Sequence, residues 1–158
     1  MKREIYELFQ EGSKEKILAY LEEELKVRNE SAFWAEKVVP FSSAILSVLQ
    51  PLEQKGLLFD PQGIAQQTLT PELFLEWNDF LSLKMLAFTL QKSNDAGVLL
   101  RTKLPLELCQ IYEPIDLDEI GSYLAKYSVN LEREDLDFPI ASYNLHQGVS
   151  NVIRSLWI

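Results

Sequence analysis

A stripe of large apolar residues at helical spacing constrains the fold of this chain more than any other sequence feature. Its members step by four, three, four, three and four residues: Trp34, Val38, Phe41, Ile45, Val48 and Leu52. This period places all six side chains on one face of an α-helix, which must be buried against other elements. Pro40 lies inside the stripe and removes a backbone hydrogen bond, so we expect a bend there, and Gly56 is expected to end the helix.

Helical spacing continues on both sides of this stripe. Ser13 is a suitable cap for a helix that runs to about Arg28. Thr70 and Pro71 form a strong start signal, a capping hydroxyl followed by a proline in the first turn. The helix that they open is expected to continue without a break and to form the centre of the core, with these residues along it: Leu73, Trp77, Phe80, Leu81, Lys84, Met85 and Phe88.

The rest of the chain is predicted to form a connector and shorter helices. Residues 57–69 contain the turn residues of a connector. Residues 93–95 are expected to end the preceding helix and to cap a short one through Leu99 and Leu100. Asp116 and Glu119 have the spacing of a capping box, and Pro139 is expected to start the last helix.

These patterns predict an all-α fold. No segment alternates with the two-residue period of a half-buried strand for long enough to build a sheet. We therefore expect one domain over residues 1–158, an irregular bundle of six or seven helices of which two are long. The apolar pattern stops abruptly at Trp157 and Ile158, which favours an internal fragment of a larger protein.

The charge of the chain disfavours a direct role with nucleic acid. Its formal net charge is −9, from 24 acidic and 15 basic residues, and no cluster of Lys and Arg is evident. A basic protein partner suits this charge better. Runs of acidic residues are mostly typical of a solvated face, and the candidate docking residues for such a partner are Glu22, Glu23, Glu24, Glu132, Glu134, Asp135 and Asp137.

Chemically reactive side chains are scarce. His146 and Cys109 are the single histidine and cysteine, and neither has a nucleophile, metal-ligand or CxxC spacing beside it. The chain contains neither GxxxxGK[ST] nor GxGxxG. We therefore expect no catalytic, cofactor-binding or metal-binding residue, and we interpret His146 as a partly buried helix residue. Six aromatic residues are expected in the core rather than around a cofactor: Phe33, Trp34, Phe41, Trp77, Phe80 and Phe88.

Cysteine usage and hydropathy predict the compartment. One cysteine cannot form an internal disulfide, which suits a reducing environment. No apolar run approaches the roughly 20 residues of a membrane span, and residues 1–10 do not resemble a signal peptide. We expect a cytoplasmic domain that makes no membrane contact of its own.

Three stretches, taken together, resemble one family. Residues 9–17 include a helix start of the form Gly-Ser-x-Glu-x-Ile. Residues 31–37 contain Phe33-Trp34 and lead into the small and apolar residues 44–49. Residues 143–150 carry Gln147 and precede Ser155-Leu156. The chain is similar in these stretches to the all-alpha domain of type IV secretion coupling ATPases, and the TraD/DotL-like branch is nearest.

The resemblance implies a function. In that family this domain sits at the cytoplasmic end of a hexameric, membrane-anchored motor, and the sites for ATP and Mg lie elsewhere in the parent ATPase. It would recruit a secreted effector protein, a small accessory or adaptor protein, or a relaxase-DNA complex for protein transport or conjugation. The acidity of this chain favours protein cargo. The alternative is a free-standing helical regulator or secretion chaperone that binds a partner protein.

Overall fold

The computed structural model describes residues 3–28, 32–101, 110–129 and 139–157, and these form an all-α fold. Seven helices and no strands are present in this part of the chain, as the sequence predicts. The helices are α1 (Arg3–Glu11), α2 (Lys14–Val27), α3 (Ala32–Gln54), α4 (Pro71–Glu76), α5 (Phe80–Ala96), α6 (Asp118–Ala125) and α7 (Ile140–Trp157).

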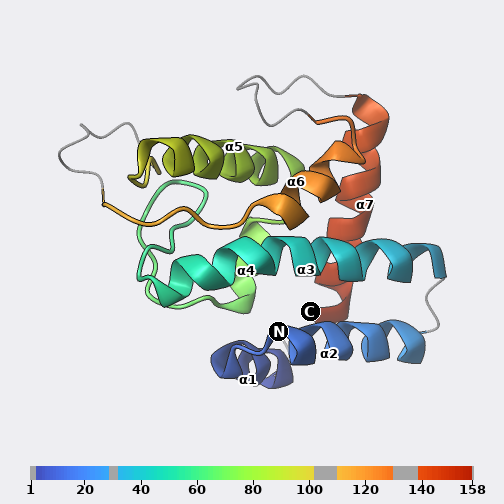
Figure 1. The fold of residues 1–158 in the computed structure, drawn as a ribbon. Helices are drawn as coiled ribbons and strands as arrows, with labels where there is room; N and C mark the ends of the chain where they lie inside the picture. The colour runs from blue at the N-terminus through green and yellow to red at the C-terminus, as the bar shows by residue number, and fades with distance from the viewer. Residues whose placement is uncertain (1–2, 29–31, 102–109, 130–138, 158) are drawn as a thin grey trace.

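The helix α3 forms the centre of the arrangement. In Figure 1 it crosses the molecule between α2 on one side and α5 and α6 on the other, while α7 crosses the others steeply. The most extensive contacts of α3 are with α2, α6 and α7. Five residues of its apolar stripe are fully buried, namely Val38, Phe41, Ile45, Val48 and Leu52. The stripe therefore sets the position of three other helices, because each of them covers part of it.

The helix α3 contains two prolines and is unusually apolar. Pro40 and Pro51 both lie inside the helix without ending it. By length and composition α3 is also apolar enough to cross a membrane, contrary to our expectation that no segment approaches this limit. Its buried side chains pack into the core of the domain, which accounts for its apolar composition.

The start of α2 follows a local sequence signal, whereas Trp157 packs against residues that are far away in the sequence. Ser13 caps α2 and accepts a hydrogen bond from the Lys16 amide, as predicted. Trp157 is fully buried, with its ring centroid 5.5 Å from that of Phe9 and 5.1 Å from that of Phe74. This aromatic cluster joins α1, α4 and the end of α7.

The prediction of one long helix from Pro71 to Phe88 is wrong, because the chain forms two helices there. Thr70 caps α4 as expected, but α4 ends at Glu76. Asp79 then leaves the helical conformation, and its carboxylate accepts hydrogen bonds from the amide and hydroxyl of Ser82. A helix of six residues and a new capped helix replace the continuous one, which turns the chain at Asn78.

Two further predictions are wrong in detail. No helix covers Leu99 and Leu100, because α5 runs on to Ala96 and ends at Gly97 in the left-handed conformation, after which Val98 pairs with Ile111 in an isolated antiparallel bridge. The capping box is also incomplete. The Asp116 carboxylate accepts from the Asp118 amide, whereas the Glu119 side chain turns away to other partners.

Removal of the cap at Asp79 tests the observed break. Asp79→Ala deletes the acceptor for two donors at the start of α5, so we expect a loss of about 1 kcal/mol in the free energy of unfolding. Asp79→Asn keeps an acceptor oxygen and should retain most of that stability. Urea denaturation of the three proteins checks this. Equal stability of wild type and Asp79→Ala would contradict the capping role.

Candidate functional site

His146 lies at the meeting point of four structural elements. It lies on α7 and is fully buried, whereas we expected a partly buried residue. Its Nδ1 lies 2.7 Å from the Tyr123 hydroxyl oxygen of α6, and its Nε2 lies 2.5 Å from the Asn78 carbonyl oxygen at the turn between α4 and α5. Because a carbonyl oxygen only accepts, Nε2 carries the proton and Nδ1 accepts from the Tyr123 hydroxyl. The ring of Phe41, from α3, lies 4.8 Å away.

The surroundings of His146 hold it neutral. Burial lowers its pKa from 6.5 to about 4, although the hydrogen bond to the Asn78 carbonyl and the charge of Asp79 act in the opposite direction. Burial likewise raises the pKa of the Tyr123 hydroxyl, which lies 3.3 Å from that of Tyr127. A neutral imidazole with both nitrogens bonded to the protein is a structural group that connects α7 to α6 and to the α4–α5 turn.

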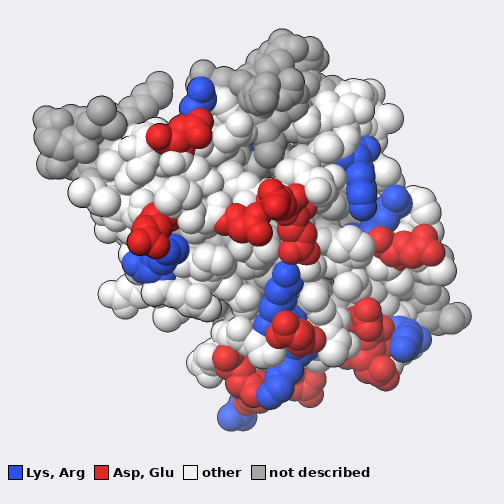
Figure 2. Space-filling view, viewed as in Figure 1, with Lys and Arg blue, Asp and Glu red and all other residues white. Residues whose placement is uncertain are grey.

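The structure describes three of the seven acidic residues that were predicted to dock a partner. Glu22 and Glu23 are exposed on α2, and Glu24 is partly buried there. Residues Glu132, Glu134, Asp135 and Asp137 lie outside the described residues. Figure 2 shows acidic groups interspersed with Lys and Arg on the face in view. That face offers mixed charge to a partner rather than one acidic field.

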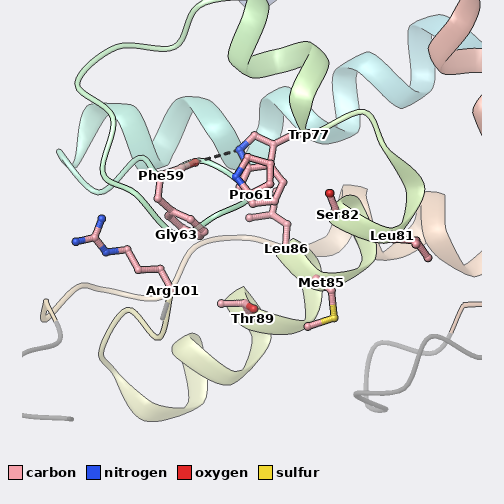
Figure 3. Close-up of a pocket in the computed structure, with 10 residues that line it drawn as sticks. All are labelled: Phe59, Pro61, Gly63, Trp77, Leu81, Ser82, Met85, Leu86, Thr89 and Arg101. Atoms are coloured by element: carbon pink, nitrogen blue, oxygen red, sulfur yellow. Dashed lines mark hydrogen bonds between the residues drawn. The ribbon is translucent and has the colours of Figure 1, made fainter. Parts of the chain in front are cut away.

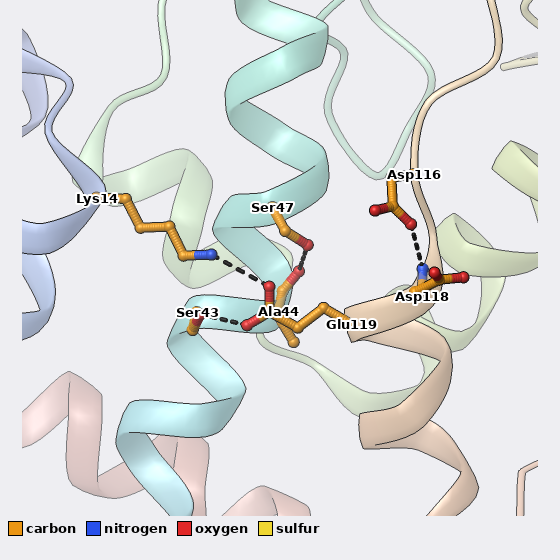
Figure 4. A network of polar contacts seen from close by, with 7 residues as sticks. All are labelled: Lys14, Ser43, Ala44, Ser47, Asp116, Asp118 and Glu119. Carbon is orange, nitrogen blue, oxygen red and sulfur yellow. Dashed lines mark hydrogen bonds and ion pairs between the residues drawn. The ribbon is translucent and has the colours of Figure 1, made fainter.

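One acidic side chain has a clear structural role. Glu119 at the start of α6 pairs with Lys14 of α2 at 3.1 Å and accepts a hydrogen bond from the Ser43 hydroxyl of α3 (Figure 4). The Glu119 carboxylate therefore links three helices at their surface. This explains why it does not close the predicted capping box.

Three of the six aromatic residues expected in the core are buried, Trp34 and Phe88 are half-buried, and Phe33 is exposed. Phe41, Trp77 and Phe80 are buried as predicted. Phe33 is 50% exposed, so that prediction is wrong, and its ring lies 4.8 Å from the Lys37 ammonium. Trp34 is half-buried against the backbone of Gly148, where an added Cβ would lie 2.7 Å from the indole.

A groove of about 320 Å³ on the surface of the described residues is a candidate binding site. Its walls come from the 57–69 connector and from α5, and Trp77 lies between them (Figure 3). The Trp77 indole N–H donates to the Phe59 carbonyl oxygen at 3.0 Å and so fixes the connector beside α5. Sequence reasoning missed this groove because its walls come from separate segments that only the fold brings together.

The described residues also bear on metals and cofactors. No group of three or more His, Cys, Asp and Glu side chains that could hold a metal ion occurs within the described ranges. Cys109 lies outside these ranges.

Comparison of the chain with protein-family models, with curated proteins and with solved structures finds no match. The resemblance to coupling ATPases therefore stays a prediction from the sequence. The interpretation of the site rests on the geometry described above.

The buried histidine predicts a pH dependence of stability. Because the pKa of His146 is lower in the folded chain than the unfolded value of 6.5, its contribution is fully present above pH 6.5 and is lost as the pH falls to about 4. The shift of the pKa from 6.5 to about 4 corresponds to a loss of roughly 3 kcal/mol in the free energy of unfolding. Urea denaturation between pH 7 and 4 measures it.

The control for this prediction is His146→Gln, which replaces the titrating imidazole with an uncharged amide that still donates and accepts hydrogen bonds. Carboxylates contribute to the slope in both proteins, so the difference between the two curves isolates the histidine. We expect the variant to be less stable at pH 7 and to lose less stability on acidification. Parallel curves would show that His146 is not held neutral.

Proposed function

We propose that this chain is a protein-recognition domain, and that it serves as the all-alpha domain of a type IV secretion coupling ATPase. In that role it recruits a secreted effector, a small accessory protein or a relaxase-DNA complex to the secretion channel. The observation that carries the proposal is the groove beside Trp77, a largely apolar hollow of about 320 Å³ on the surface. The single histidine, His146, is fully buried and is therefore not part of this surface. Surface hollows with apolar walls are typical binding sites.

The stretches that resemble the coupling ATPases belong to the scaffold of this fold. Ser13 caps α2, and Trp34 of the second stretch packs on Gly148 of the third. Phe9 of the first stretch packs on Trp157. A common set of caps and packing residues supports a common domain architecture, while leaving the recognition surface free to differ between cargoes.

The charge supports protein cargo over direct contact with DNA. A net charge of −9 repels a phosphate backbone and raises the association rate of a basic partner. In the proposed setting the domain is cytoplasmic and reaches the inner membrane only through the parent protein. ATP, Mg and the hexameric assembly likewise belong to that parent.

Capture from the native cytosol tests this function. We expect the chain, used as bait, to recover a secreted protein or a small secretion accessory protein, with less recovered at physiological than at low salt because electrostatic attraction is screened. Mass spectrometry identifies the captured proteins. Recovery of a relaxase with DNA would move the function to conjugation, and recovery of no secretion component at either salt would contradict the proposal.

Charge reversal tests where a basic partner docks. Replacing Glu132, Glu134, Asp135 and Asp137 with lysine should weaken the captured interaction and flatten its salt dependence. Reversal of Glu22, Glu23 and Glu24 tests the other candidate acidic run, which lies on α2, in the same way. Affinity is measured by titration calorimetry. Unchanged affinity after the first reversal would exclude that acidic run as the docking surface.

A further inference from the structure

The groove beside Trp77 has an uneven chemistry that the proposed function does not explain. Among the described residues that line it, Arg101 is the single charged one, although the chain as a whole is strongly acidic. Figure 3 shows Arg101 at one end of the groove, and Leu81 and Met85 toward the other. The groove is therefore lined mainly by apolar residues and is basic at one end.

Two polar groups inside the groove are already engaged. The Trp77 indole donates to the Phe59 carbonyl oxygen, and the Ser82 hydroxyl lies 3.3 Å from the Asp79 carboxylate. An occupant therefore gains little from polar atoms at these positions and must fill the space with apolar groups. Met85 suits this, because its flexible thioether adapts to different side chains.

The size of the groove limits what enters it. About 320 Å³ is near the lower end of the range of ligand pockets, roughly 300–1,000 Å³. A space of this size receives one or two large side chains of a partner. On the α5 wall, Leu81, Met85 and Thr89 follow one another at intervals of four residues and form a ridge. Such a ridge packs well against the side-chain rows of another helix.

Arg101 supplies the complementary charge. It forms no ion pair with any residue of the described ranges. A guanidinium group binds a carboxylate through two parallel hydrogen bonds, which also fixes the direction of the bound segment. A run of acidic residues would be repelled by the net charge of −9, so one carboxylate beside apolar side chains fits best.

We propose that the groove binds a short helical segment of a partner protein through two apolar side chains one turn apart and one Asp or Glu side chain that pairs with Arg101. This inference rests on the proposed function and specifies the chemistry of the recognised segment. The apolar anchors give the affinity, and the carboxylate sets the orientation.

The test is a selection from a display library of helical peptides, with the whole chain as the target. Sequences with two apolar residues at i and i+4 and a neighbouring Asp or Glu should be enriched. A synthetic copy of the strongest peptide should bind Arg101→Glu at least about tenfold more weakly. A Glu→Lys or Asp→Lys version of that peptide should bind Arg101→Glu better than it binds the wild type.

The matched control is Arg154→Glu, which makes the same charge change at an exposed position of α7. It should leave the affinity for the acidic peptide unchanged. Equal weakening by both variants would reduce the effect to net charge and overturn the inference. Enrichment of peptides without an acidic residue, or no enrichment, would also overturn it. Circular dichroism and the melting temperature confirm that each variant is folded.

A second measurement separates this inference from the proposed function. Leu81 is 37% exposed, so Leu81→Asp places a charge in the groove without entering the core. If this variant no longer captures the secretion partner that the wild type captures, the groove is the binding site. If it captures the partner equally well, the groove inference is wrong while the recognition function stands. If the wild type captures none but still selects acidic peptides, the proposed function alone fails.

Discussion

The pair of hydrogen bonds at His146 is the constraint on which the rest of the structure depends. One bond leads to the Asn78 carbonyl between α4 and α5, and the other comes from the Tyr123 hydroxyl of α6. An unsatisfied polar group at this depth would be costly, so the three elements are held in one relative position. The break between α4 and α5 supplies the carbonyl, because Asn78 belongs to neither helix and its oxygen accepts from His146 of α7.

The same break also produces the recognition surface. Trp77 is the first residue after α4, and its indole reaches the Phe59 carbonyl in the connector. The connector is thereby fixed next to α5, and the space between them is the groove. A substitution in the buried centre would therefore disturb binding indirectly, by moving the turn that carries Trp77.

Features encoded locally were predictable from the sequence. The period of α3 and the cap at Ser13 depend on neighbouring residues alone, so α2 and α3 begin and end close to where the pattern places them. The break at Asn78 was not predicted, because the apolar period continues through it and because the Asn78 carbonyl bonds to His146, which is 68 residues away in the sequence. The same reasoning applies to Leu99, whose conformation is set by pairing between residues 98 and 111.

The candidate site was less predictable than the fold. A sequence shows that His146 is alone, but its partners lie 23 and 68 residues away, so neither its complete burial nor its tautomer could be read from spacing. Arg101 is likewise an ordinary surface residue until the fold places it at the end of an apolar groove. Runs of charged residues, by contrast, are evident in the sequence, but the sequence does not show which run contacts a partner.

The most direct test of this account is the protonation state of the two His146 ring nitrogens, measured by nitrogen-15 NMR of the selectively labelled chain at neutral pH. Because His146 is the single histidine, its signals need no separate assignment. The account predicts a neutral ring protonated at Nε2, with a slowly exchanging proton, and an unprotonated Nδ1. A ring protonated at Nδ1, or one that exchanges rapidly between tautomers, would contradict the hydrogen bonds that organise this fold.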